Sequence, residues 1–181
     1  ERADRPSREA GRMGNVSVEK ESAERERTMA TREETLESRG YPMDDTPTPG
    51  GLYQPVVVDR GVAYLAGAVP VAAGKVATCG KVPSAVSVEE AQKAAELCAA
   101  NLLRVFARDV GPLSKIARVV KVTCFVNSDQ AFTDPHIVVN GASKLIMDVL
   151  GEAGAHARSA VGVATLPLGA SVEVEMIVSV A

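Results

Sequence analysis

Tryptophan is absent from this chain of 181 residues, and aromatic residues make up only 3% of it. A hydrophobic content of 46% is still ample for a core, so the core must be built from valine, alanine, leucine and isoleucine. Histidine is equally scarce, because His136 and His156 are the two in the chain and they lie far apart in the sequence. The sequence therefore does not indicate a metal site.

The three cysteines, Cys79, Cys98 and Cys124, are odd in number and lack Cys-x-x-Cys spacing. Reduced thiols in a cytoplasmic protein are the simplest interpretation. A net charge of −3 offers no basic surface for nucleic acid or for an anionic membrane. No apolar run approaches the roughly 18 residues that span a bilayer, so we expect no membrane partner.

The first 28 residues differ in composition from the rest, since about half of them are charged and none is aromatic. Such a segment cannot bury enough apolar surface to offset the chain entropy lost on ordering. We expect residues 1–28 to be a disordered or non-native extension and residues 29–181 to form one domain. The many arginines would also fit a mitochondrial presequence, but the glutamates argue against it.

Beyond that segment, strand and helix patterns alternate. Residues 31–40 have the pattern of a short helix, and residues 41–51 form a Pro/Gly-rich connection. Two β-branched runs within residues 55–69, joined by Asp-Arg-Gly, predict a hairpin. Residues 71–83 allow a further short edge strand.

Two longer helices are also predicted. Ser87 and Glu90 form a capping box at the start of a long amphipathic segment, and Pro135 opens a second helix that ends near Gly151. Residues 115–126, between them, have mostly apolar residues at alternate positions, as in a strand. The order ββ(β)-α-β-α-ββ indicates an α+β domain in which two helices cross a mixed sheet.

The C-terminal residues 156–181 predict a second hairpin, closed by Leu-Pro-Leu-Gly. In its last strand Glu173 and Glu175 share a face with few other polar residues. Two helices cover only one face of a sheet, so this other face would remain bare and largely apolar. This face could alternatively be exposed to solvent. The shortage of Lys, Thr and Gln on it favours burial against another subunit.

Three segments carry a family resemblance. ARSAVGVATLPLGASVEVEMIV resembles the C-terminal signature of the RidA/YjgF family, also known as L-PSP endoribonucleases or translation inhibitors. GLYQPVVVDRGVAYLAGAVPV resembles the family's N-terminal hairpin, and FTDPHIVVNGASKLI resembles the start of its second helix. The resemblance covers residues 40–181, and NGAS with HARSAVGVATLPLGA is typical of a branch whose substrates are mostly unassigned.

The resemblance implies a chorismate-mutase-like fold and a homotrimer in which three sheets close an inner barrel, with clefts between subunits. It implies hydrolytic deamination of reactive enamines and imines, released by pyridoxal-phosphate enzymes such as threonine dehydratase, to 2-oxo acids and ammonia. The implied partners are an imino or 2-oxo acid and further copies of the chain. The reaction calls for no metal and no organic cofactor.

The family's functional residues can be placed in this sequence. Arg158 corresponds to the arginine that binds the substrate carboxylate, and Glu173 to the acidic residue that positions water. Tyr53, Gly67 and Asn140 correspond to the cleft tyrosine, the glycine that contributes its backbone, and the asparagine at the helix start. An arginine can hold a carboxylate through two parallel hydrogen bonds, and a glutamate in a partly dry pocket can order water and relay a proton.

The sequence departs from the family at two places. Many members have a cysteine where this chain has Ala160, which rules out a thiol nucleophile there, and Ala66 and Ala68 replace a common serine and glutamine. Two other functions remain open. One is a non-catalytic trimer that binds small carboxylates, because the same arginine would serve binding and turnover. The other is the endoribonuclease of the family name, against which the net charge and the lack of a histidine pair weigh.

Overall fold

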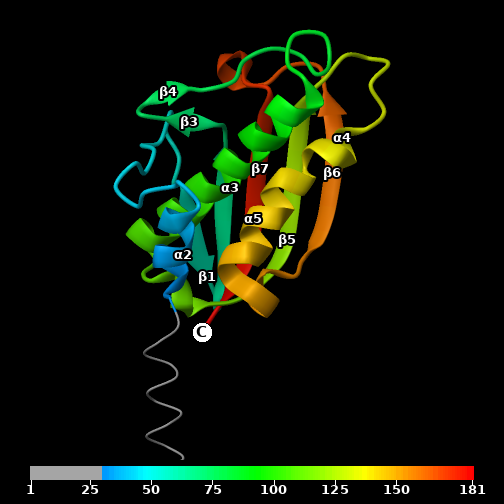
Figure 1. The fold of residues 1–181 in the computed structure, drawn as a ribbon. Coiled ribbons are helices and arrows are strands. Elements are labelled where there is room, and N and C mark those ends of the chain that lie inside the picture. Colours follow the sequence, from blue (N-terminus) through cyan, green and yellow to red (C-terminus); the bar gives the residue numbers. More distant parts are fainter. Residues whose placement is uncertain (1–29) are drawn as a thin grey trace, which may run out of the picture. The chain divides into compact units, whose positions relative to one another are not determined.

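A five-stranded mixed sheet is the central feature of the computed structural model, which describes residues 30–181 (Figure 1). The strands lie in the order β1-β2-β7-β5-β6, and every neighbouring pair is antiparallel except β5 and β6, which are parallel. Their bounds are β1 (Val56–Asp59), β2 (Val62–Ala68), β5 (Ile116–Asn127), β6 (Ala157–Val163) and β7 (Val172–Val180). This is the α+β architecture that the element pattern predicts.

Helices α3 (Val88–Asp109) and α5 (Asn140–Leu150) pack against each other over one face of the sheet (Figure 1). The predicted capping box is present, since the Ser87 hydroxyl accepts from the Glu90 amide and the Glu90 carboxylate accepts from the Ser87 amide. The short helix α4 (Pro135–Val138) leads into α5. Two helices on one face are therefore confirmed, but the second, predicted from Pro135 to near Gly151, is divided at Val139 into α4 and α5.

The short helix α2 (Arg32–Ser38) is also confirmed and is anchored through its first residue. Its Arg32 guanidinium donates to the carbonyls of Leu113 and Ile116, at 2.8 and 2.9 Å. Leu36 is fully buried, and Gly40 follows the helix with a φ of +89°. The prediction made for residues 1–28 lies outside the described residues.

The β1–β2 hairpin forms as predicted, with its turn at Arg60 and Gly61, whose φ angles are +47° and +76°. The edge strand expected in residues 71–83 is instead a separate two-stranded hairpin, β3 (Val71–Ala72) and β4 (Lys75–Val76). Positive φ angles at Ala73 and Gly74 reverse the chain after only two residues, which leaves no length for pairing with the main sheet.

The C-terminal hairpin prediction is wrong, because β5 lies between β6 and β7 and pairs with both. The link 164–171, with a 3-10 turn at Pro167–Gly169, is long enough to pass the end of β5. Lys81 connects the end of β5 to the start of this link. Its ammonium donates to Asn127 Oδ1 at 3.1 Å and to the carbonyl of Ala164 at 2.7 Å. The sequence shows two strands and a turn but not the strand inserted between them.

The two faces of the sheet differ as the alternation in β7 predicts. Val172, Val174, Met176 and Val178 are buried, whereas Glu173, Glu175, Ile177 and Ser179 lie partly exposed on the opposite face. We call this second face the open face. Within residues 30–181 no helix covers it, and three apolar side chains that share it are roughly half exposed: Val57, Tyr64 and Val161.

Candidate functional site

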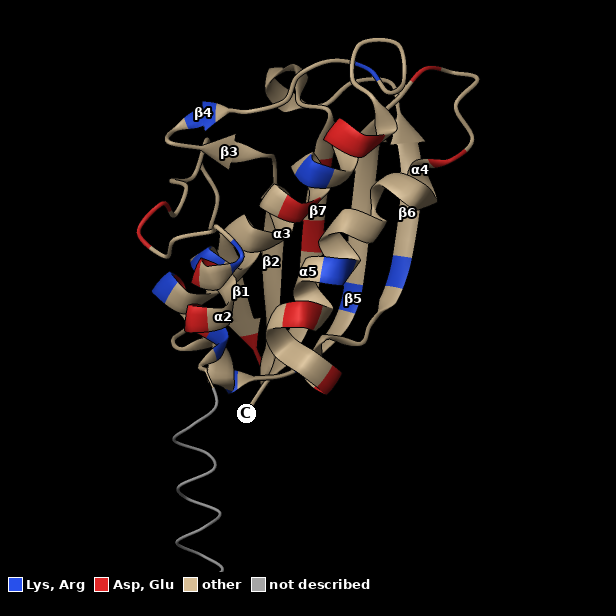
Figure 2. Ribbon diagram, viewed as in Figure 1, with Lys and Arg blue, Asp and Glu red and all other residues tan. Residues whose placement is uncertain are grey.

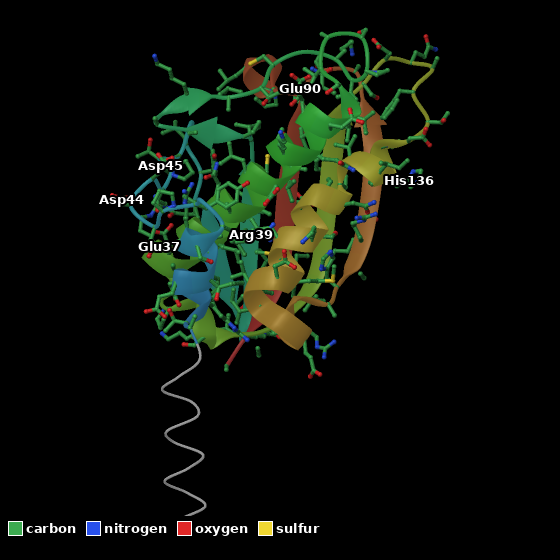
Figure 3. The ribbon with its side chains drawn as sticks, in the orientation of Figure 1. Glu37, Arg39, Asp44, Asp45, Glu90 and His136 are labelled. Atoms are coloured by element: carbon green, nitrogen blue, oxygen red, sulfur yellow. The ribbon has the colours of Figure 1, made fainter. Side chains whose placement is uncertain are left out.

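Arg158 lies on the edge strand β6, where it is the basic residue of that strand in Figure 2. Its Nη1 donates to Asn140 Oδ1 and to Ser143 Oγ, both at 3.0 Å, and its Nη2 donates to the carbonyl of His136 at 3.1 Å. Figure 3 shows His136 on α4 next to this edge of the sheet. A guanidinium has five N–H donors, so two remain without a protein partner among the described residues.

The helix starts that hold Arg158 are themselves fixed by close packing. A Cβ added at Gly141 would collide with the carbonyl of Gln92, so only a glycine lets α5 approach α3 this closely. The Gln92 side chain also donates to the carbonyl of Ile137, at 2.9 Å. The first turn of α5, which carries Asn140 and Ser143, is therefore held in place against α3.

Ser143 and His156 extend this network, and the sequence did not single them out for this role. Ser143 Oγ lies 3.0 Å from His156 Nε2, and His156 Nδ1 lies 2.6 Å from the carbonyl oxygen of Gly154. A signal existed in the spacing: Ser143 follows Asn140 by about one helical turn, and His156 precedes Arg158 by two positions in an extended segment. Ser143 therefore faces the same side of its helix as Asn140, and His156 faces the same side of its extended segment as Arg158.

Glu173 lies on the open face at the centre of the sheet, with its side chain partly buried. Burial raises the pKa of this carboxyl, and the charge of Glu175 raises it further. Gly67 lies beside it on β2, at an irregularity in the pairing with β7 between Leu65 and Ala68. A Cβ at Gly67 would collide with the Glu173 carboxylate, so the absence of a side chain at Gly67 makes room for the glutamate.

The candidate residues thus form two separate groups. Asn140 and Arg158 are in direct contact, and so are Gly67 and Glu173. Arg158 is in register with Val122, which is buried under the helices, whereas Glu173 is in register with Phe125 on the open face. Residues in register point to the same side of a sheet, so Arg158 and Glu173 lie on opposite faces of one chain.

Tyr53 belongs to neither group. It precedes β1, the strand at the opposite edge of the sheet from β6, and its side chain is about half exposed. The arrangement of β1 and β6 at the two edges separates Tyr53 from Arg158 by the width of the sheet.

The two core cysteines are unreactive. Cys98 and Cys124 are fully buried, and burial raises the pKa of the Cys124 thiol to about 12 and that of Cys98 well above its ordinary value. Both thiols are therefore protonated at neutral pH.

Residues 30–181 contain no cluster of His, Cys, Asp or Glu that is suited to hold a metal ion. In the same range, no helix combines the length and apolarity needed to cross a bilayer.

The sequence profile of the Endoribonuclease L-PSP family matches residues 43–180. The chain therefore belongs to this family, as its C-terminal signature indicates. Protein TCP17 of Trypanosoma cruzi is 47% identical over 100 residues, which make up 55% of this chain and 62% of TCP17. The chain thus spans less than two thirds of the length of that relative.

Two crystal structures share the fold. Protein Atu1372 of unknown function, from Agrobacterium tumefaciens, is 45% identical, with a TM-score of 0.75 over 83% of this chain and 92% of that chain. A candidate endoribonuclease from Shewanella oneidensis is 24% identical, with a TM-score of 0.79 over 83% of this chain and 100% of that chain. The mixed sheet with its helices is therefore an architecture already seen in this family.

Proposed function

We propose that this protein hydrolyses reactive enamines or imines of amino acids to 2-oxo acids and ammonia. The observation that carries the proposal is the fixation of Arg158. Three hydrogen bonds hold its guanidinium in one orientation, and its other two N–H donors have no partner within residues 30–181. A planar, oriented guanidinium with two free donors is suited to bind a carboxylate, the group that every imino acid carries.

We propose that the complete site lies between two copies of the chain. Arg158 and Glu173 lie on opposite faces of the sheet, so one chain alone does not present both to one small molecule. The open face is partly apolar and exposes Val161 and Tyr64. Such a face favours burial against another subunit, and a homotrimer with an inner barrel would bring the Gly67–Glu173 pair of one copy near Arg158 of the next.

In this proposal Arg158 binds the substrate carboxylate and Glu173 handles the proton of the attacking water. Water adds to the imine carbon as Glu173 accepts a proton from it, and the same carboxyl then protonates the nitrogen. In the resulting carbinolamine, Glu173 accepts the hydroxyl proton and returns a proton to the amino nitrogen. The C–N bond then breaks as the carbonyl forms, which releases ammonia and leaves the 2-oxo acid. The raised pKa of Glu173 brings its two protonation states closer in energy near neutral pH, as a proton relay requires.

The other candidate residues have supporting roles in this proposal. The Asn140 side-chain oxygen is used by Arg158, so Asn140 orients the arginine. Gly67 gives the Glu173 carboxylate its space. Tyr53, near the β1 edge, would line the cleft that a neighbouring subunit completes.

A coupled assay tests the proposal. Threonine dehydratase releases a reactive enamine that tautomerises to the imine, and the appearance of the 2-oxo acid is followed with and without this protein. We expect the protein to accelerate 2-oxo acid release and Glu173→Gln to abolish most of that acceleration. Binding of 2-oxobutanoate without acceleration by the wild-type protein would favour the carboxylate-binding module instead. Cleavage of RNA by the purified protein, lost in Glu173→Gln, would favour the endoribonuclease.

A further inference from the structure

We propose that Ser143 and His156 form a hydrogen-bonded relay that positions Arg158, and that the relay requires neutral His156 with its proton on Nδ1. The relay runs from Arg158 Nη1 to Ser143 Oγ at 3.0 Å, on to His156 Nε2 at 3.0 Å, and ends at the carbonyl of Gly154. Its link to catalysis rests on the proposed function, because that function gives Arg158 a carboxylate to bind.

The direction of every hydrogen bond in the relay follows from its two ends. The Gly154 carbonyl can only accept, and its oxygen lies 2.6 Å from His156 Nδ1, so Nδ1 carries the proton. In the neutral imidazole that we propose, His156 Nε2 then has a lone pair and accepts the hydroxyl proton of Ser143. Since the Ser143 proton points to His156, the lone pairs of Ser143 Oγ are left for Arg158.

The other neutral tautomer would break this order. With its proton on Nε2, His156 would donate to Ser143 Oγ and would turn a bare Nδ1 lone pair toward the Gly154 carbonyl. Two acceptors facing each other at 2.6 Å repel, and a buried acceptor left without a donor costs free energy. The structure therefore selects one tautomer, and that tautomer keeps Ser143 oriented to accept from Arg158.

Both ends of the relay are rigid, so the relay can impose a position on the arginine. Ser143 is buried in the first turns of α5, and its amide donates to the Val139 carbonyl at 3.2 Å. Gly154 is buried in the 3-10 turn Gly151–Gly154, where an added Cβ would lie 2.6 Å from the Ile146 carbonyl of α5. The turn Gly151–Gly154 therefore packs closely against α5, the helix that carries Ser143.

Because Ser143 is buried and His156 reaches Arg158 only through it, we assign both as positioning residues and not as catalytic residues. A lost positioning contact should weaken carboxylate binding in the ground state and the transition state alike. We therefore expect KM to rise while kcat changes little.

The first test does not depend on any activity. In the wild-type protein labelled with 15N, the imidazole nitrogen shifts of the two histidines are recorded by NMR, and the His156→Gln variant assigns the His156 signals by their loss. In the neutral imidazole we expect the proton on Nδ1 and none on Nε2. A proton on Nε2 would overturn the proposal, whether or not the protein hydrolyses imines.

The second test measures the effect on ligand binding. The affinity for 2-oxobutanoate and the KM of imine hydrolysis are compared for wild type, Ser143→Ala, His156→Leu and His156→Gln. We expect KM and Kd to rise about tenfold in Ser143→Ala and His156→Leu. In His156→Gln, whose amide oxygen can accept from Ser143, we expect both to stay within about threefold of wild type.

Wild-type binding in a folded His156→Leu protein would overturn the proposal, as would equal losses in the Leu and Gln variants. Ligand binding and 2-oxo acid release by the wild-type protein distinguish this outcome from failure of the proposed function. If wild type neither binds 2-oxobutanoate nor accelerates 2-oxo acid release, the proposed function is wrong, and the tautomer measurement still decides whether the relay exists. Thermal melting and size-exclusion profiles of each variant show that the fold is retained.

Discussion

Gly67 and Glu173 occupy complementary space on the open face: a Cβ added at Gly67 would collide with the Glu173 carboxylate. The two residues come from neighbouring strands, β2 and β7, at the point where their pairing is irregular. The φ angle of Gly67 is not among the positive values found at other glycines of the chain. The glycine is therefore required for the room it leaves and not for its backbone conformation.

Gly67→Ala is expected to reduce imine hydrolysis tenfold or more with little change in stability. The new methyl group meets the end of a flexible side chain, so Glu173 can rotate away at a cost within about 1 kcal/mol, but its carboxylate then leaves the position proposed for catalysis. The measurement is kcat/KM together with a thermal melt. Gly50→Ala is the matched control, because nothing lies near its added Cβ. Full activity in Gly67→Ala would contradict the importance of this carboxylate position.

Glu173→Gln is expected to stabilise the fold at neutral pH. Burial, and then the charge of Glu175, raise the pKa of Glu173 above its ordinary value of 4.5, so the folded state holds this proton more tightly than the unfolded state. The charged glutamate therefore lowers stability as the pH rises from that ordinary value through the raised pKa. The variant should melt higher than wild type at pH 7 to 8, on the order of a few degrees.

The pH dependence is the control for this prediction. Below the ordinary glutamate pKa of 4.5, Glu173 is protonated in both states and the difference in Tm between variant and wild type should vanish. Melting curves over a pH series measure it. A Glu173→Gln protein that is less stable than wild type at neutral pH would show that the carboxylate makes a favourable contact there.

Arg158→Lys is expected to lose at least about tenfold in kcat/KM, equivalent to roughly 1.4 kcal/mol of transition-state binding. A lysine keeps the charge, but its single ammonium cannot contact Asn140, Ser143 and the His136 carbonyl and still offer two parallel donors to a carboxylate. Arg158→Ala should lose more. The assay compares 2-oxo acid release by the three proteins, with size exclusion as the folding control. Wild-type rates in a folded Arg158→Ala protein would remove Arg158 from the mechanism.

Val161→Glu is expected to weaken assembly. Val161 is 44% exposed, and its register with Phe125 places it on the open face that the proposed trimer buries. A buried, unpaired carboxylate costs several kcal/mol, so the variant should sediment as a smaller species at micromolar concentration. Met147→Glu, on α5, is the matched control because Met147 is 47% exposed on the helix layer. A wild-type protein that is itself a stable monomer would contradict both the assembly and the site between subunits.

The local elements were predictable from sequence because their causes are local. The capping box of Ser87 and Glu90 operates within one helical turn, and the alternation of Glu173 and Glu175 with valines depends on a period of two residues. The turn at Gly61 depends on its own backbone conformation. The C-terminal signature was sufficient to indicate the family, and the family's sequence profile matches residues 43–180.

Relations between distant segments were not predictable in the same way. A strand, a turn and a strand suggested a hairpin, but β5 inserts between β6 and β7 and makes β6 an edge strand. Pairing with β5 sets the register of β6, and that register turns Arg158 toward the helices while Glu173 faces the open side. Nothing in the local pattern of either strand encodes the register of a strand that lies more than thirty residues away.

The sequence by itself determined which segments become helices and strands, which face of β7 carries the two glutamates, and which residues match the family's site. Only the tertiary structure decided that Arg158 and Asn140 meet on one side of the sheet, that Gly67 and Glu173 meet on the other, and that Ser143 and His156 extend the first group. The physical reason is that periodicity and capping act over a few residues. Hydrogen bonds between side chains depend on how whole elements pack, and that packing is settled by the burial of the core as a unit.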